Sequence, residues 1–227
     1  MNEVHRALKP LSSDLPYDSE LAIASLSRSD ERLGFLIQLV GDYEMDYRPT
    51  LHVFEALCRS ITAQQLSGKA AATIYGRFCD LLPENMSVRP EAIQALSVDA
   101  MRSVGLSRAK TTAIQDLAKK TLDGVVPAGD TIHELPDDEI MDRLTSVRGI
   151  GPWTVEMLMM FRLGRPDVLP ATDLGIRKGF AILYDTIELP GPKALLKYGE
   201  RWRPFRTVAS WYLWRVLDLA EGALPPP

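Results

Sequence analysis

The chain has 227 residues, of which 46% are hydrophobic and 25% charged, as expected for one large globular domain or two small lobes. No apolar run approaches the length of a membrane span, and the polar start Met-Asn-Glu-Val-His-Arg has no apolar signal core, so we expect no membrane contact and a cytoplasmic location. The net charge of −4 argues against a uniformly basic surface but allows a local basic face.

Helical patterns begin near the N-terminus. Residues 1–18 have two prolines and little periodicity, and we interpret them as an arm. Helices are predicted from the capping signals at Asp18 and Asp30 to about Ser27 and Val40. From residue 50, one apolar residue per turn predicts a helix that ends at 63–67, and Ser67 then caps a second helix over 69–82.

The pair Gln64-Gln65 lies in the break between these two helices. A random polar pair at such a place most often satisfies loose helix ends. The alternative is a plug: an uncharged side chain that enters the gap left when a base leaves the DNA duplex.

Further helices are predicted over 90–96, 98–104 and 108–122, followed by a loop over 124–136. Ser107 caps the long helix 108–122. Arg108 and Lys110 at its start are interpreted as solvated charges beside a structural turn, with DNA contact as the alternative.

Two helices over 137–146 and 152–163 enclose the short turn Val-Arg-Gly-Ile-Gly. Gly149 and Gly151 can adopt positive φ and let another backbone approach, and Pro152 suits a first helical position. The N–H groups of such a turn favour an anion such as a DNA phosphate. An ordinary helical hairpin is the alternative.

The remaining helices are predicted over 173–184, 192–202 and from Pro204 onward. Asp173 opens the first of them, which by itself suggests only a helix cap. No strand of useful length is found, so the predicted fold is all-α.

The order of hairpin, apolar helix, proline-containing loop and Asp173 resembles the helix-hairpin-helix superfamily of DNA base-excision glycosylases. Ile61-x-x-Gln64-x-x-Ser67 is similar to the 3-methyladenine DNA glycosylase II family within it. The resemblance covers about residues 45–220. It implies two helical lobes with a cleft between them in a core over 46–227, and an N-terminal arm with short helices over 1–45 that packs on the second lobe.

The resemblance also implies roles for individual residues. Asp173 would be catalytic, stabilising positive charge on the sugar. Trp153, Met157 and Trp214 would line a base pocket, although a Trp–Met stripe is more often core. The implied DNA-binding residues are Gln64, Gln65 (the inserting residue), Ser67, Arg148, Gly149, Gly151 and Lys178. The implied substrate is double-stranded DNA with alkylated purines such as 3-methyladenine, whose cationic bases suit an aromatic wall.

Relatives that also cut the strand have a lysine where this chain has Trp153, so the resemblance implies base release without a lyase step. No cofactor is required. A structural monovalent or divalent cation, held by the carbonyls of Thr145, Val147 and Ile150, is carried over from the family. Cys58 and Cys79 are too few for an iron–sulfur cluster.

We expect a monomer, nucleoid-associated if the source is bacterial. The alternatives are a glycosylase of the same fold for another lesion and a helix-hairpin-helix DNA-binding module without catalysis, which would have no use for Asp173.

Overall fold

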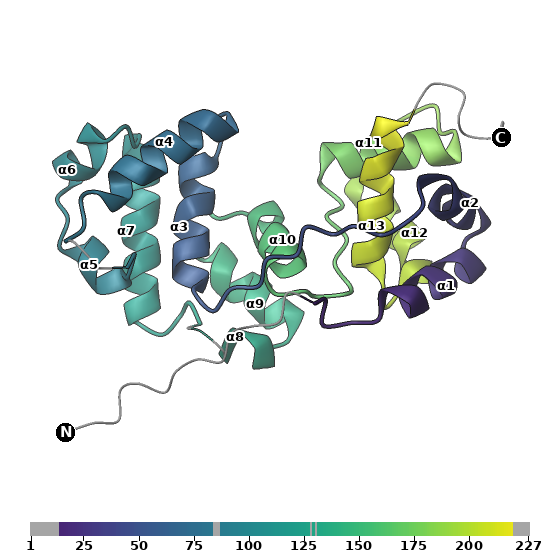
Figure 1. Ribbon diagram of the computed structural model, residues 1–227, viewed down its shortest axis with the longest axis horizontal. Helices are drawn as coiled ribbons and strands as arrows, with labels where there is room; N and C mark the ends of the chain where they lie inside the picture. The colour runs from purple at the N-terminus through teal and green to yellow at the C-terminus, as the bar shows by residue number, and fades with distance from the viewer. Residues whose placement is uncertain (1–13, 84–86, 128, 130, 220–227) are drawn as a thin grey trace. The chain divides into compact units, whose positions relative to one another are not determined.

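The computed structural model describes residues 14–83, 87–127, 129 and 131–219, and these contain helices and no strand (Figure 1). The predicted all-α fold is confirmed. The predicted arm lies mostly outside the described residues. Within them, no helix is long and apolar enough to cross a membrane.

The chain forms two compact units. The central unit comprises residues 50–158, and the terminal unit combines residues 1–49 with 159–227. The chain passes from one unit to the other twice, after residue 49 and after residue 158. The second passage falls inside helix α10 (Pro152–Phe161).

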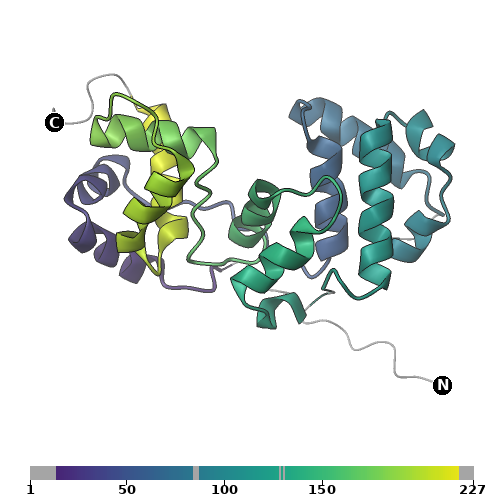
Figure 2. The ribbon, with the colours of Figure 1, turned by 180° about the vertical axis from the view of Figure 1, so that it is seen from behind.

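The central unit is organised around α7 (Arg108–Leu122), which packs against α3 (Val53–Ala63), α5 (Pro90–Gln94) and α6 (Val98–Ser103) (Figure 2). The other helices of the unit are α4 (Gly68–Cys79), α8 (Thr131–Glu134) and α9 (Asp137–Thr145). Leu57, Ile61, Ile114 and Leu117 are fully buried because they recur at helical spacing on facing sides of α3 and α7.

The terminal unit contains α1 (Ser19–Ser29), α2 (Glu31–Val40), α11 (Leu174–Tyr184), α12 (Pro192–Gly199) and α13 (Arg206–Arg215), with 3₁₀ turns at Glu200–Trp202 and Val216–Asp218. Hydrogen bonds of Asp30 connect the two chain segments of the terminal unit. The Asp30 carboxylate caps α2 through the Leu33 N–H (3.1 Å) and accepts hydrogen bonds from Tyr184 Oη (2.7 Å) and Trp202 Nε1 (2.9 Å). The N-terminal helices are thereby held on an aromatic cluster near the C-terminus.

Helices α11 and α13 approach so closely that their contact includes backbone. A Cβ atom on Gly179 would lie 1.9 Å from the Leu213 carbonyl oxygen. Only glycine fits there, and the register of these two helices is fixed by it.

Several predicted boundaries need correction. The predicted loop over 124–136 contains α8, and the helix predicted over 69–82 ends at Cys79. The last helix begins at Arg206 and not at Pro204. Its start is set by distant partners, because the Arg206 N–H donates to Asp167 Oδ1 (3.4 Å) and the Thr207 N–H to the Pro166 carbonyl (2.9 Å).

Candidate functional site

The turn between α9 and α10 has the predicted short form. The Ile150 N–H donates to the Val147 carbonyl (3.1 Å), and both side chains are buried. Gly149 has φ +77°, and a Cβ there would lie 3.1 Å from the Ala113 side chain. Gly151 could also adopt a positive φ but does not. A Cβ at Gly151 would meet no protein atom within 4 Å, so this side of the turn has open space for a ligand.

Helix α7 supports this turn with charged side chains. Asp116 Oδ2 accepts a hydrogen bond from the Arg148 N–H (2.8 Å), and Lys120 Nζ donates to the Ser146 carbonyl. Burial raises the pKa of Asp116, but the Arg148 N–H and Lys120 lower it by more, so the net pKa lies below its ordinary value. The Arg148 side chain itself is exposed.

The break after α3 carries the glutamine pair. Gln64 Nε2 donates to the Gly149 carbonyl (2.9 Å), so the side chain of Gln64 joins the break to the hairpin turn. Gln65 has φ +59°, a region that non-glycine residues seldom adopt, and its side chain is exposed. Of the pair, Gln65 is therefore the residue presented to solvent.

Two other predicted DNA contacts lie at exposed positions. Ser67 caps α4, with its Oγ accepting from the Ala70 N–H (3.4 Å). Lys178 lies on α11 of the terminal unit with an exposed side chain. Trp153 and Met157 lie on α10: the Trp153 side chain is 47% exposed, and Met157 is half-buried. Trp153 thus lies outside the core, as a ligand-contacting aromatic residue must.

Asp173 caps α11 through a hydrogen bond from the Ile176 N–H to Oδ1 (2.9 Å). The indole Nε1 of Trp214 donates to the same oxygen at 2.9 Å, and its ring is stacked on Phe161, with centroids 6.1 Å apart. A Cβ on Gly175 would lie 2.9 Å from Trp214 Cδ1 and 3.0 Å from Asp173 Oδ1. The glycine therefore makes room for a carboxylate oriented by two donors.

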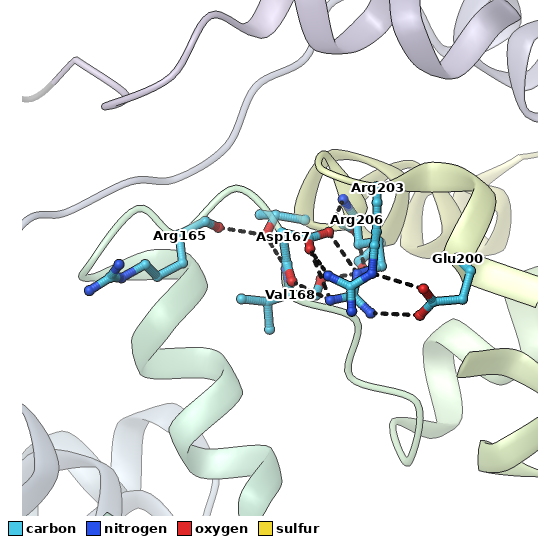
Figure 3. A network of polar contacts seen from close by, with 8 residues as sticks. Arg165, Asp167, Val168, Glu200, Arg203 and Arg206 are labelled. Carbon is cyan, nitrogen blue, oxygen red and sulfur yellow. Dashed lines mark hydrogen bonds and ion pairs between the residues drawn. The ribbon is translucent and has the colours of Figure 1, made fainter. Parts of the chain in front are cut away.

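The loop that leads to Asp173 is fastened to the start of α13 by a polar network (Figure 3). The Asp167 carboxylate accepts from Arg206 Nε (2.6 Å) and from Arg203, and Arg203 Nε pairs with Glu200 (3.0 Å). Thr207 Oγ1 donates to the Arg165 carbonyl (2.6 Å) and accepts from the Val168 N–H (3.0 Å). Because α13 carries Trp214, the network fixes both partners of the Asp173–Trp214 hydrogen bond.

The described residues contain no group of three or more His, Cys, Asp or Glu side chains that could hold a metal ion. Any cation at the hairpin would depend on neutral backbone carbonyls. The carbonyls of Ser146 and Gly149 are engaged by side-chain donors, and they are not the ones predicted. Of the predicted carbonyls of Thr145, Val147 and Ile150, that of Val147 already accepts a hydrogen bond from the Ile150 N–H.

Some contacts could not be found from the sequence. The roles of Lys110 and Lys120 depend on carbonyls 48 and 26 residues away, and that of Trp214 on an aspartate 41 residues away. Spacing along the chain carries no signal for them. The one cue was the position of Lys110 in the first turn of a capped helix, which places it near the preceding connection.

Comparison with known proteins gives consistent matches. Residues 58–204 match the model of the HhH-GPD superfamily base excision DNA repair protein. The chain is 38% identical over 205 residues to DNA-3-methyladenine glycosylase 1 of Schizosaccharomyces pombe, covering 88% of each chain.

Two solved structures are also similar. The Schizosaccharomyces pombe 3-methyladenine DNA glycosylase in complex with abasic DNA has a TM-score of 0.72 at 38% identity, over 88% of this chain and 98% of that one. The DNA-3-methyladenine glycosidase of Bacillus halodurans has a TM-score of 0.76 at 35% identity, over 90% of each chain.

Proposed function

This chain belongs to the HhH-GPD superfamily of base excision DNA repair proteins, and from that membership we propose that it is a DNA glycosylase that releases alkylated purines of the 3-methyladenine type. The observation that carries the proposal is Asp173, a carboxylate at a helix start whose Oδ1 is fixed by the Ile176 N–H and the Trp214 indole. A module that only binds DNA has no use for such a carboxylate near phosphates.

The chemistry follows from the charge that develops on the sugar. As the bond between C1′ and the base nitrogen lengthens, its electron pair leaves with the base and positive charge builds on the sugar ring. The Asp173 carboxylate stabilises this charge. Water then adds its oxygen to C1′, its extra proton passes to the solvent, and an abasic sugar remains. A base alkylated on a ring nitrogen already carries positive charge and leaves readily, so no strong general acid is required.

Base selection is assigned to aromatic and polarizable side chains. An exposed Trp153 gives a cationic base a π face, a contact that contributes about 0.5–2 kcal/mol. Met157 and Trp214 are also assigned to contact with the base, and Gln65 is the proposed plug for the gap in the duplex. The DNA backbone would contact the hairpin N–H groups, Arg148 and Lys178.

A cation at the hairpin would be held by the carbonyls of Thr145, Val147 and Ile150, and it would supply positive charge toward a phosphate. We further propose that the protein acts as a monomer and makes no strand cut, because Trp153 has no amine to attack C1′.

The test is incubation of the protein with duplex DNA treated with a methylating agent, followed by chromatography of the released bases. Release of 3-methyladenine in excess of spontaneous loss is the expected result. DNA binding without any base release would indicate that the protein is a non-catalytic DNA-binding module. Release of a different damaged base would indicate a glycosylase of the same fold for another lesion.

A further inference from the structure

Lys110 has a role that its sequence position does not reveal. Its ammonium donates to the carbonyl of Thr62 and to that of Gln64, each at 2.8 Å. These carbonyls lie in the last turn of α3 and at its C-cap, where no helical N–H follows to pair with them. A lysine from α7 thus caps α3 across 46 to 48 residues of sequence.

The capped backbone is the one that presents Gln65. Gln64 is held at two points, its carbonyl by Lys110 and its side chain by the Gly149 carbonyl (2.9 Å). The next residue takes φ +59°, a conformation that is unfavourable outside glycine and persists only where its surroundings enforce it. With Gln64 fixed, the backbone direction at Gln65 is also fixed.

The same helix holds the hairpin turn. At its start Lys110 engages the break after α3. Further along, Asp116 and Lys120 engage the Arg148 N–H and the Ser146 carbonyl. Both α3 and α7 lie in the central unit and run side by side (Figures 1 and 2). One rigid helix therefore sets the spacing between the glutamine break and the hairpin.

We infer that Lys110 is a positioning residue for DNA distortion: by capping α3 it holds Gln65 in register with the phosphate-binding hairpin, so that the plug enters the duplex when the hairpin is bound. This inference rests on the proposed function. It differs from a phosphate contact, because the ammonium is engaged by two protein carbonyls. Burial lowers the pKa of Lys110, in keeping with a partly enclosed ammonium.

The experiment compares Lys110→Met with wild type and with Lys119→Met, a matched control on the exposed side of α7, where Lys119 pairs with Asp123 (3.2 Å) on the same helical stretch. Single-turnover base release is measured on two methylated duplexes. In one the lesion has a normal partner, and in the other it lies opposite an abasic site, which is already unstacked and needs no plug. Affinity for undamaged duplex is measured over a range of salt concentrations.

For Lys110→Met we expect release from the paired duplex to fall by about tenfold or more. Release from the abasic-partner duplex and the salt slope should stay near wild type, and Lys119→Met should match wild type throughout. Unchanged release, an equal fall on both duplexes, or a salt slope smaller by about 0.9 would each overturn the inference. The last result would identify a phosphate contact.

Two precautions keep the test decisive. If Lys110→Met does not fold, Lys110→Gln replaces it, since its amide can still donate one hydrogen bond and should give an intermediate loss on the paired duplex alone. Wild-type protein that releases no base from either duplex contradicts the proposed function, whereas wild-type activity with indifferent Lys110 variants contradicts only the role of Lys110.

Discussion

Asp173 is the side chain on which the proposed charge stabilisation depends, and one of its oxygens accepts two hydrogen bonds. The Ile176 N–H comes from the local helix start, whereas the Trp214 indole comes from another helix. The first contact would exist in any capped helix. The second distinguishes this aspartate from the cap at Asp18, for which only the local N–H contact is described. Asp30 also accepts an indole N–H, from Trp202, but Asp30 is buried, whereas Asp173 is partly exposed, as a carboxylate that meets a substrate must be.

Asp173→Asn removes the charge but keeps an oxygen acceptor for both donors. We expect base release to fall by about a hundredfold or more, with lesion binding and Tm little changed, because charge stabilisation is lost while the cap remains. Single-turnover release from methylated duplex measures this. Asp18→Asn, which alters an exposed cap of α1, is the matched control and should behave as wild type. Near-normal release by Asp173→Asn would reduce the residue to a helix cap.

Trp214→Phe separates hydrogen bonding from ring contact. Phenylalanine can retain the stack on Phe161 but cannot donate to Asp173 Oδ1. We expect a rate lowered by about tenfold and a free energy of unfolding lowered by about 1 kcal/mol, the usual value of one hydrogen bond. Release kinetics and urea unfolding give the two quantities. A wild-type rate would mean that Trp214 acts only as an aromatic wall.

At the scale of elements, glycines decide how closely segments approach. Gly179→Ala places a Cβ against the Leu213 carbonyl, and we expect the free energy of unfolding to fall by about 3 kcal/mol or more as α11 and α13 separate. Urea denaturation measures it. Gly76→Ala, inside α4 with no neighbouring atom within 4 Å, is the control and should stabilise by about 0.5–1 kcal/mol. Equal stabilities of the two variants would contradict the close packing.

The hairpin offers a substitution that the protein itself should tolerate. Since a Cβ at Gly151 meets no protein atom within 4 Å, we expect Gly151→Asp to leave Tm unchanged. Its carboxylate would repel phosphate, so affinity for damaged and undamaged duplex alike should fall by about tenfold or more. Gly151→Ala adds bulk without charge and should fall less. Fluorescence anisotropy gives the affinities, and unchanged binding would show that no phosphate lies there.

Local signals predicted the elements that depend on neighbours in the chain. Ser107 and Asp173 cap helices where their sequence context indicated, and the helix 108–122 has the predicted bounds. The predicted start of α13 was wrong because the observed start depends on a hydrogen bond to Asp167, which lies 39 residues away in the sequence. Of the two hairpin glycines that can adopt a positive φ, Gly149 does so and Gly151 does not, and glycine at position 151 instead leaves open space beside the turn. Contacts made across long sequence separations are absent from any local pattern.

At the scale of the whole molecule, the state of the DNA strand after base release shows whether any amine of the protein reaches the sugar. Strand cutting needs an amine at C1′, and the position that would supply it holds Trp153. Borohydride treatment during turnover should therefore yield no covalent protein–DNA adduct, and strands should break only after alkali. Gel electrophoresis resolves both products. A trapped adduct would identify a recruited lysine and a bifunctional enzyme.

The nesting of residues 50–158 between the two segments of the terminal unit has a consequence for synthesis. Helices α1 and α2 emerge from the ribosome first, yet the aromatic cluster that buries Leu26 and Leu33 is translated only after the central unit. At about 5–20 residues per second, the intervening stretch of about 110 residues imposes a delay of roughly 5–20 s. During that time the nascent N-terminal helices expose apolar faces that a chaperone can bind, while the central unit already has all of its own sequence.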